Sequence, residues 1–477
     1  MSTTEPAGGT PSGQVGCEPV VTVIRSAGAY FEGKQFRAQW LARDLMDTIR
    51  FITFTDTKEI YYYDEGVYHP LGEPLIHSEV ERVLGEEATV HRVDEVENHI
   101  RRSTFVGRES IAGDAELLCV RNGILHLTEK TVGPHTPDQI FLNRIPVVFD
   151  PDAECPQIQR FISEVVDAED IPVVQEIFGY CLWRRSDLDK AVMFVGEGSN
   201  GKSTLIELLV RLLGVDNVSG VSLQQLEANR FATAELYGKL ANVYADLTDE
   251  SLRHTGTFKM LVGGDLISAE RKFKSPFKFY NCAKLIYSCN KVPETRDDTT
   301  AFYRRWIIIN FTHVFVRGED EDPTILDKIT SEEELSGLLN WALEGLARLL
   351  KQGQFTYSPT VDALRQQYMM KSNPVQAFVE THLEVDPMGE ILKSDLYQFF
   401  VEFCKEVKLP VKANNVFGKE LPSYINVRSG QKHGKTVWYG IKYTTKSPEL
   451  EESEKSESEN DDEENDILDD IFNDGWL

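Results

Sequence analysis

The pattern of apolar and polar residues predicts a mixed α+β region in the first third of the chain. Residues 53–63, continuing to 66–68, are rich in aromatic and β-branched types and read as a strand hairpin. A second hairpin is predicted over 117–127, where an Asn-Gly pair separates two apolar runs. We expect these strands to belong to one N-terminal domain over residues 35–150.

Four tyrosines, Tyr61, Tyr62, Tyr63 and Tyr68, stand in the first of these hairpins. Their rings have two available uses, because an exposed ring stacks on nucleic-acid bases whereas a covered ring packs a small sheet. We favour packing over base stacking.

A longer α/β region is predicted from residue 151 to residue 372. It opens with helical periodicity over 155–189 and continues with the apolar run 191–195, which reads as a buried strand. Further helical patterns follow at 204–213 and 331–352. The order of these elements predicts an α/β fold class for the central part of the chain.

After an Asn-Pro pair at 373–374 the pattern changes to a smaller unit, residues 373–446. Helical segments at 375–383 and 393–407 precede two strands within 424–441, which surround a Gly-rich turn. Helices followed by a basic two-stranded ribbon indicate a small winged-helix-like DNA-binding domain.

The composition of the two terminal segments indicates that neither can form a hydrophobic core of its own. Residues 1–30 are rich in Gly, Pro, Ser and Thr, and residues 447–477 are strongly acidic, so both are predicted to be disordered. Fourteen acids and one lysine from Glu449 to Leu477 carry −13 of the formal charge of −27. The other 448 residues carry only −14, which is compatible with local basic clusters that face DNA.

Cysteine usage and hydropathy bear on the compartment. The seven cysteines stand far apart without a CxxC pair, so neither a zinc site nor a disulfide framework is predicted. No apolar run approaches the length of a membrane span, and the N-terminus lacks the pattern of a signal peptide. We expect a protein of the cytoplasm, or of the host-cell cytoplasm if a virus or plasmid encodes it, without a membrane partner.

The most informative stretch runs from Gly196 to Ser203 and reads GEGSNGKS. Its glycines free the backbone, so that consecutive N–H groups converge on phosphate oxygens at the start of a helix. Lys202 is predicted to reach the β- and γ-phosphates of a triphosphate, and the Ser203 hydroxyl to bind Mg²⁺. The predicted nucleotide-binding residues are Gly196, Glu197, Gly198, Ser199, Asn200, Gly201, Lys202, Ser203 and Thr204.

Two apolar strands after this loop are each predicted to end in a polar side chain. Asp246 follows the first and is the candidate ligand of Mg²⁺ that also orients the attacking water. Asn290 follows the second and is placed to bond the γ-phosphate or that water. Asp249 and Glu250 are further acids close behind Asp246. A simple cap of a strand end or of a turn is the structural alternative for Asp246 and for Asn290.

A run that alternates basic and aromatic residues lies between these two strands, after a Gly-Gly-Asp turn. Its cations Arg271, Lys272 and Lys274 are predicted to contact DNA phosphates, while the rings lie against bases or core. A solvated basic face is the alternative.

Two adjacent arginines, Arg304 and Arg305, precede the apolar strand 307–311. One of them is predicted to reach the γ-phosphate bound by a neighbouring subunit, where such an arginine accelerates phosphoryl transfer by about 10³ to 10⁵. As a surface salt bridge the pair would contribute only about 0 to 1 kcal/mol. Their place downstream of Asn290 favours the catalytic role.

In this order the motifs GEGSNGKS, ADLTDE, GGDLISAERKFKSPFKF, SCNKVPETRD and FYRRW resemble those of superfamily 3 helicases of the phage, plasmid and large-DNA-virus primase-associated type. The likeness is strong from residue 155 to residue 312 and weaker on either side. It implies an AAA+-like ATPase that uses ATP and Mg²⁺. It also implies a ring, commonly a hexamer, that translocates along single-stranded DNA from 3′ to 5′.

The resemblance places Lys202 and Ser203 in the Walker A motif, Asp246 in the Walker B motif and Asn290 at the sensor position. Relatives often have two adjacent acids in the Walker B motif, whereas Asp246 has an apolar neighbour on each side. The identity of the second acid therefore stays open.

The same resemblance assigns Lys272 and Lys274 to a hairpin that faces the central channel, and Arg304 or Arg305 to the arginine finger. Longer relatives carry a primase-polymerase domain in front of the helicase. The roughly 150 residues available here are too few for that domain, so a separate primase or polymerase is expected as a partner.

The expected function is ATP-driven unwinding of duplex DNA at a replication fork or origin, with single-stranded and forked DNA as the expected partners. The alternative is a loader or initiator factor that uses ATP to assemble replication proteins without unwinding. Both predict ATP hydrolysis that DNA stimulates, and strand displacement separates them. An RNA-directed or metabolic enzyme is disfavoured by the basic-aromatic run.

The acidic tail combines dense carboxylates with apolar residues near its end, among them Ile471, Phe472 and Trp476. Three roles stay open for it: docking of another replication protein, solubilisation, and occupation of the DNA channel when no substrate is bound.

Overall fold

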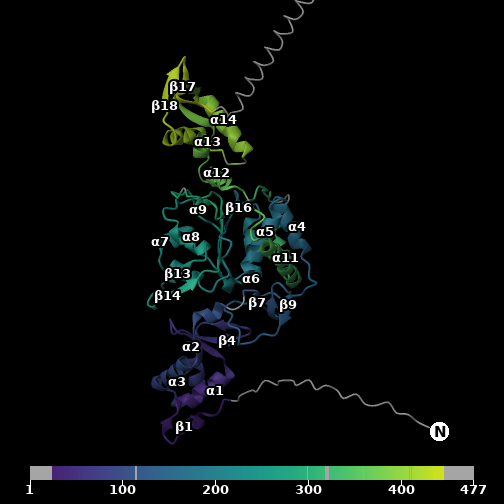
Figure 1. Ribbon diagram of the computed structural model, residues 1–477, viewed down its shortest axis with the longest axis vertical. Coiled ribbons are helices and arrows are strands. Elements are labelled where there is room, and N and C mark those ends of the chain that lie inside the picture. Colours follow the sequence, from purple (N-terminus) through teal and green to yellow (C-terminus); the bar gives the residue numbers. More distant parts are fainter. Residues whose placement is uncertain are drawn as a thin grey trace, which may run out of the picture. The chain divides into compact units, whose positions relative to one another are not determined.

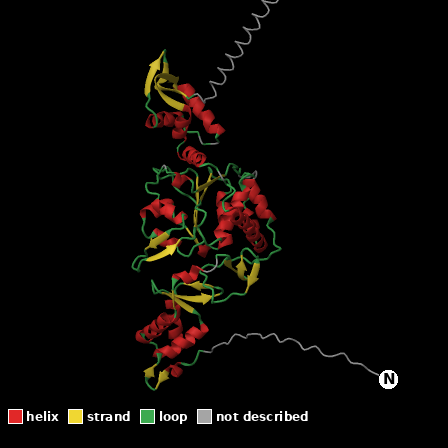
Figure 2. Ribbon diagram, viewed as in Figure 1, coloured by secondary structure: helices red, strands yellow, loops and turns green. Residues whose placement is uncertain are grey.

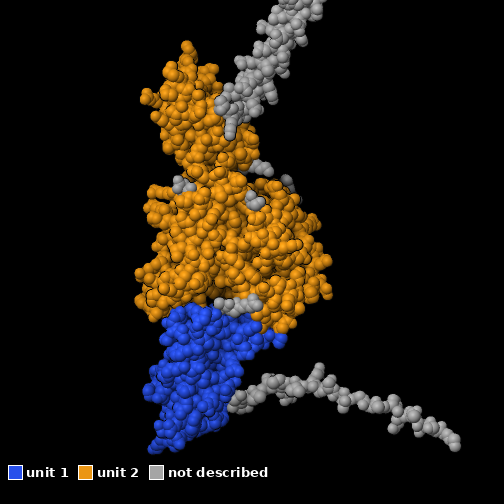
Figure 3. Space-filling view, in the orientation of Figure 1, with its two compact units in different colours: residues 1–114, 134–142 blue, residues 115–133, 143–477 orange. Residues whose placement is uncertain are grey.

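The computed structural model describes residues 24–112, 115–297, 299–316, 322–357, 359–407, 409 and 411–444 (Figure 1). Figure 2 distinguishes the helices and strands of these residues. The chain divides into two compact units, which are residues 1–114 with 134–142 and residues 115–133 with 143–477 (Figure 3). The predicted acidic tail and the predicted leader up to residue 23 lie outside the described residues.

The first unit combines helices with a small mixed sheet. Its helices are α1 (Ala38–Thr48), α2 (Gly72–Leu84) and α3 (Val90–Ser103), with 3-10 turns at Ala27–Tyr30, Gly85–Glu87 and Arg108–Ala112. Its strands are β1 (Phe31–Glu32), β2 (Gln35–Phe36), β3 (Phe51–Phe54), β4 (Ile60–Asp64), β5 (Val67–His69) and β6 (Phe105–Val106). The sheet has the order β5-β4-β3-β6, and its β3–β6 pair is parallel. The apolar faces of the three helices pack together, with Leu41, Ile76 and Val96 fully buried.

The folded part of the first unit starts earlier than composition predicts. Tyr30 is fully buried, and its hydroxyl donates to Asp44 Oδ2 at 2.8 Å. The Arg25 guanidinium pairs with the same carboxylate at 2.9 Å. The predicted leader boundary at residue 30 is therefore wrong, because a single buried aromatic ring outweighs the surrounding small and polar residues.

The predicted tyrosine hairpin is present as β3, β4 and β5. Tyr61 and Tyr68 are each 5% exposed. The Tyr61 ring lies 4.9 Å from that of Phe54, and the Tyr68 ring lies 5.3 Å from that of Tyr63. The packing interpretation is confirmed for Tyr61 and Tyr68, since covered rings are not available for stacking on bases.

The second unit contains the central sheet. Its helices before residue 373 are α4 (Pro156–Val165), α5 (Ile171–Leu182), α6 (Lys202–Leu213), α7 (Leu223–Ala228), α8 (Gly256–Val262), α9 (Thr300–Tyr303), α10 (Ile325–Ile329), α11 (Glu332–Gln352) and α12 (Val361–Ser372), with 3-10 turns at Val215–Asn217 and Ala232–Leu236. The strands of its central sheet are β10 (Ala191–Val195), β11 (Val218–Ser219), β12 (Ala241–Tyr244), β15 (Lys284–Cys289) and β16 (Trp306–Asn310). All neighbouring pairs are parallel, in the order β11-β12-β15-β10-β16, which agrees with the predicted α/β class.

Helices cover both faces of this sheet (Figure 1). Because successive strand residues point to opposite faces, Val192 and Phe194 of β10 pack in one core with α4, α5, α6 and α11. Ala191, Met193 and Val195 pack in a second core with α7, α8, α9 and α12. Burial on both faces explains why this strand appears in the sequence as an unbroken apolar run.

The predicted hairpin at 117–127 forms, but outside the predicted domain. It consists of β7 (Leu117–Val120) and β8 (Gly123–His126), which continue into β9 (Thr131–Gly133). Leu118 and Leu125 belong to the core of the second unit. The predicted N-terminal domain, 35–150, is therefore divided between two units, because local pattern predicts a hairpin and not the surface on which it packs.

The chain after residue 373 forms a smaller module with its own core. Its elements are α13 (Pro374–His382), β17 (Leu383–Leu392), α14 (Lys393–Glu406), α15 (Asn414–Glu420), a 3-10 turn at Leu421–Ser423, β18 (Arg428–Lys432) and β19 (Lys435–Tyr443). The sheet is antiparallel with the order β17-β19-β18, and both predicted helices and the ribbon are present. Strand β17 and helix α15 were not predicted. DNA binding by this winged-helix-like module stays a prediction.

The turn of the ribbon is shorter than predicted. Lys432 pairs with Lys435, so the turn is His433-Gly434, and Gly430 lies within β18. A Cβ on Gly430 would lie 2.7 Å from the Tyr439 ring. This glycine thus serves the close approach of a ring on the neighbouring strand rather than a turn.

Within the described ranges, each helix is either too short or too polar to cross a lipid bilayer.

Candidate active site

The predicted phosphate loop joins the end of β10 to the start of α6, and close packing explains its glycines. A Cβ on Gly196 would lie 2.6 Å from the Phe311 carbonyl oxygen. One on Gly201 would lie 2.4 Å from Val165 on α4. Gly198 has a φ of +109°, a conformation that residues with a side chain rarely adopt. The loop therefore packs against Phe311, which follows β16, and against the Val165 side chain of α4 so closely that Gly196 and Gly201 leave no room for a larger residue.

Lys202 is the first residue of α6 and is 5% exposed. Its ammonium group donates to the Gly196 carbonyl at 2.5 Å and to Asn200 Oδ1 at 3.1 Å. Burial lowers the pKa of Lys202, and the nearby Cys289 and Asp246 oppose that shift. Both hydrogen-bond partners belong to the loop itself, and phosphate oxygens can replace them as acceptors.

The carboxyl ends of the parallel strands bring the other candidates to the same edge of the sheet. Val195 pairs in register with Cys289, so Asn290 stands beside the phosphate loop. Asp246 emerges two residues after β12, the next strand beyond β15. Ligands of open α/β sheets bind at this edge, where helices begin and strands end.

A cavity of about 1260 Å³ opens over the loop at this edge. Lys202, Ser203, Asp246 and Asn290 all line it. The predicted residues in its wall are Gly198, Ser199, Asn200, Gly201, Lys202, Ser203, Thr204, Asp246 and Asn290. Its volume is sufficient for a whole nucleotide.

Some predicted residues lie outside this wall. The lining does not include Gly196 and Glu197, although the Gly196 carbonyl accepts a hydrogen bond from Lys202. Asp249 pairs with Lys291 at 3.1 Å, and neither Asp249 nor Glu250 lines the cavity. Of the three acids considered, the structure brings Asp246 alone to the cavity.

Arg304 and Arg305 lie at the opposite edge of the sheet. They precede β16, which runs parallel to β10, whereas the phosphate loop follows β10. A strand of five residues separates the two edges by about 16 Å. The Arg305 side chain is 11% exposed and donates to the Ala301 carbonyl at 2.6 Å, whereas the Arg304 side chain is 55% exposed. Neither arginine lines the cavity.

The basic-aromatic run forms a hairpin of β13 (Leu266–Ala269) and β14 (Phe277–Tyr280). Ile267, Ala269, Phe277 and Phe279 are buried in the second core, whereas Ser268 and Lys278, which alternate with them along the strands, are exposed. These two aromatic rings anchor the hairpin on the protein and are not available to bases.

The loop at the end of this hairpin carries the predicted DNA-binding residues. Lys272 and Lys274 are exposed, and between them Phe273 is 94% exposed. Arg271 is partly buried, with its guanidinium 4.9 Å from the Phe277 ring centre. The two lysines therefore extend from the surface, while Arg271 also supports the base of the loop.

Three segments of the cavity wall were not predicted. They contribute Gln157, Arg160, Phe161 and Glu164 from α4, His313 and Phe315 from the chain after β16, and Asp322, Ile325 and Lys328 at α10. Spacings of three and four residues predicted an amphipathic helix near α4. That periodicity did not reveal what its polar face covers, because the answer depends on contacts with distant segments.

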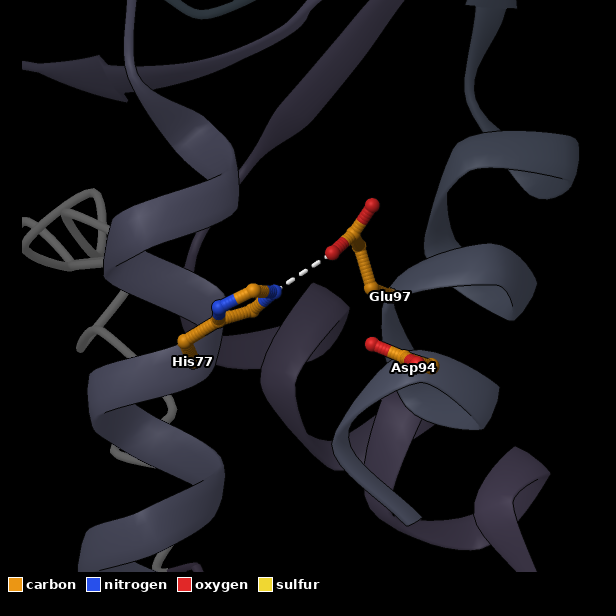
Figure 4. A group of neighbouring side chains, drawn as sticks. All are labelled: His77, Asp94 and Glu97. Atoms are coloured by element: carbon orange, nitrogen blue, oxygen red, sulfur yellow. Dashed lines mark hydrogen bonds and ion pairs between the residues drawn. The ribbon is translucent and has the colours of Figure 1, made fainter. Parts of the chain in front are cut away.

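A separate polar cluster in the first unit joins α2 to α3. The ligand-type atoms of His77, Asp94 and Glu97 all lie within 4.8 Å of one another (Figure 4). His77 Nε2 is 2.5 Å from Glu97 Oε2, and Arg101 pairs with the other oxygen of Glu97. Because a guanidinium already balances Glu97, we interpret this cluster as an ion-pair network between two helices.

Comparison with known families gives two partial matches. Residues 27–167 match a family described as "D5 N terminal like". Residues 194–305 match a family of unknown function, DUF5906. The second range begins at the end of β10 and ends at Arg305, and it contains every predicted site residue.

A protein of Acanthamoeba polyphaga mimivirus, described as a putative helicase, is 29% identical over 147 residues, which cover 29% of this chain and 15% of that protein. The structure is similar to two solved forms of the C-terminal region of NrS-1. One has a TM-score of 0.48 at 12% identity, covering 84% of this chain and 98% of the other. The second has a TM-score of 0.45 at 13% identity, covering 86% and 99%. The family matches and the viral relative support a relationship to phage and viral primase-helicase proteins.

Proposed function

We propose that this protein is an ATP-dependent DNA helicase of replication, which assembles as a ring and moves along single-stranded DNA from 3′ to 5′. The observation that carries the proposal is the single cavity lined by Lys202, Ser203, Asp246 and Asn290. The viral relative described as a helicase supports a DNA motor rather than a metabolic enzyme. The AAA+-like, superfamily 3 assignment is part of this proposal and agrees with the parallel sheet.

The chemistry of the cavity fits Mg²⁺ and ATP. The loop has no side chain at Gly196, Gly198 and Gly201, and among the described residues the hydrogen bonds of the Lys202 ammonium group go to acceptors of the loop. The Ser203 hydroxyl and the Asp246 carboxylate are hard oxygen ligands of the kind that Mg²⁺ prefers. ATP bound here would supply the phosphoanhydride bond whose hydrolysis drives movement, and Mg²⁺ would offset the charge of its phosphates.

Each residue of this edge then has one task. Lys202 offsets the negative charge of the phosphates, and Asp246 with Ser203 holds the metal. Asn290 lies beside the loop and orients the water that attacks the γ-phosphate. Cavity walls that limit access of bulk water strengthen all of these electrostatic contacts.

The position of the arginines supports a ring. An arginine about 16 Å from the cavity of its own subunit cannot reach the γ-phosphate bound there. It can serve as an arginine finger only for the cavity of another subunit. Arg304 is more exposed than Arg305, and Asp189 lies 3.5 Å from both guanidinium groups. We therefore assign the finger to Arg304, and a supporting role to Arg305, which bonds the Ala301 carbonyl.

Mixing of two inactive variants tests this assignment. Lys202→Ala lacks the ammonium group that binds the phosphates, and Arg304→Ala lacks the arginine finger. Each variant alone is therefore expected to lose ATP hydrolysis. Mixed rings contain some interfaces with both parts intact, and hydrolysis should return to a measurable fraction of the wild-type rate. A mixture as inactive as its components contradicts a shared site.

Strand displacement tests the function as a whole. The purified full chain with ATP and Mg²⁺ should release the labelled strand of a forked duplex that has a 3′ single-stranded tail. A substrate with only a 5′ tail is the control for polarity, and Lys202→Ala is the control for the motor. Hydrolysis without release supports the loader alternative, whereas the absence of DNA-stimulated hydrolysis contradicts both.

A further inference from the structure

The cavity has two ends, and the strand order separates them. Asp246 and Asn290 follow β12 and β15, which lie on one side of β10. His313 and Phe315 follow β16, which lies on the other side of β10. The loop of Lys202 follows β10 itself. A triphosphate held by Lys202 with its γ-phosphate toward Asp246 extends its other end toward Phe315.

The charged side chains at this second end are already paired. Arg160 Nε donates to Glu164 Oε1 at 2.9 Å, and both residues belong to α4. Lys328 Nζ donates to Asp322 Oδ2 at 2.6 Å. Paired charges have a weak net field and attract little further phosphate. This end of the cavity therefore fits an uncharged part of the ligand.

Apolar side chains form the rest of the wall at this end. The rings of His313 and Phe315 lie 4.4 Å apart in an edge-to-face arrangement. Phe315 and Ile325 are partly buried against the first core, to which Phe161, another residue of the cavity wall, also belongs. Flat, uncharged π-systems stack on such surfaces.

We propose that the nucleobase of the bound nucleoside triphosphate lies at this end, against Phe315 and Ile325. This assignment rests on the proposed function, because Lys202 must hold the phosphates. The backbone N–H of Phe315 donates to the Ser199 carbonyl at 2.7 Å. This hydrogen bond ties the backbone of Phe315 to the phosphate loop, so the two ends of the nucleotide site are directly linked.

Two ligands separate the ends of the cavity. ATP has a base and a triphosphate, whereas inorganic tripolyphosphate has only the phosphates. Titration calorimetry on the full chain with Mg²⁺ should show that Phe315→Ala weakens ATP binding about tenfold and leaves tripolyphosphate binding unchanged. Val314→Ala is the matched control, because Val314 is 53% exposed and does not line the cavity.

A second variant distinguishes loss of the base site from damage to the phosphate loop. Ile325→Ala alters the same end from α10, without the backbone link between Phe315 and Ser199. It should weaken ATP binding severalfold and leave tripolyphosphate binding unchanged.

The possible failures are distinguishable. Wild-type ATP affinity in both variants overturns the base site, and so does equal affinity of the wild type for ATP and tripolyphosphate. Loss of both ligands in Phe315→Ala, with Ile325→Ala unaffected, also overturns it and assigns Phe315 to support of the loop. A wild type that binds neither ligand contradicts the proposed function itself.

Discussion

Two buried lysines of the second unit, Lys202 and Lys284, have opposite surroundings. Lys284 opens β15 at the amino edge of the sheet, and its ammonium group donates to the carbonyls of Trp183, Arg185 and Cys282 at 2.7 to 2.8 Å. Lys202 opens α6 at the carboxyl edge, with two acceptors from its own loop. Burial lowers the pKa of both groups, to about 8 for Lys284.

The difference distinguishes a structural lysine, Lys284, from Lys202, the lysine that we propose to bind phosphate. An ammonium group has three N–H bonds, and Lys284 uses all three on backbone carbonyls. Lys202 uses two, and it lines a cavity. A depressed pKa is therefore a poor guide to function by itself, and the number of fixed acceptors is a better one.

Replacement of Lys202 should have the largest effect, on turnover. Lys202→Ala is expected to lower the rate of ATP hydrolysis about 10² to 10³-fold or more, because a preorganised charge at the phosphates is lost. The melting temperature should change little, since the two hydrogen bonds removed lie within a loop. A colorimetric phosphate assay measures the rate of hydrolysis, and a thermal melt measures the stability. Near-normal turnover in this variant would contradict the active-site assignment.

Replacement of Lys284 should have the opposite effect, with a large loss of stability and little change in turnover. Lys284→Met leaves three buried carbonyls without their donor, and the free energy of unfolding is expected to fall by about 4 kcal/mol. ATP hydrolysis per folded molecule should stay within about threefold of wild type, because Lys284 lies at the other edge of the sheet. Urea denaturation measures the loss, and a variant as stable as wild type would show that the three hydrogen bonds contribute little.

The pH dependence of stability sharpens the account of Lys284. Burial lowers the pKa of Lys284 from the ordinary 10.5 to about 8. Between those values the unfolded chain binds more protons than the folded one, so the contribution of this group to the free energy of unfolding rises with pH. From pH 8 to pH 10 the difference between wild type and Lys284→Met should increase by about 2 kcal/mol. Urea denaturation at both pH values tests this, and a constant or falling difference contradicts a depressed pKa.

An exposed pair of lysines provides the contrast with the smallest expected effect. Lys272→Ala combined with Lys274→Ala should lower the slope of log affinity for single-stranded DNA against log salt by about 1.4, because two fewer counterions are released. Basal ATP hydrolysis without DNA should not change, since neither residue lines the cavity. Fluorescence anisotropy across a salt series measures the slope, and identical slopes remove the hairpin from DNA binding. Lys278→Ala is the matched control, because Lys278 is an exposed lysine on the strand of the same hairpin.

Part of the site was accessible from sequence because its chemistry is local. The glycines around Lys202 and the polar ends of two apolar strands are patterns of a few residues, and the cavity contains Lys202, Asp246 and Asn290 together. The opposite end of the same cavity was not predicted. Phe161 and Phe315 are more than 150 residues apart in the chain, and neither has a local pattern that distinguishes it from a core residue.

The hairpin at 117–127 shows the same division at the level of a fold. An Asn-Gly pair between apolar runs is enough to predict two strands, and those strands form. Asn122 then bonds the backbone of Phe149, and Leu118 joins the core of the second unit. Nothing in the hairpin itself indicates which of the two units it will join.

Local sequence was enough to predict the phosphate loop, the apolar strands around it and helices such as α6 and α11, because periodicity and glycine act over a few residues. Helices α1, α2 and α3 of the first unit were not predicted. Tertiary structure alone decided that β16 lies beside β10, and with it that Arg304 is far from the cavity while Phe315 lines it. It also decided that Lys284 has three carbonyl acceptors whereas Lys202 faces a cavity. The physical reason is that strand order and burial arise from contacts between distant segments, which no local pattern contains.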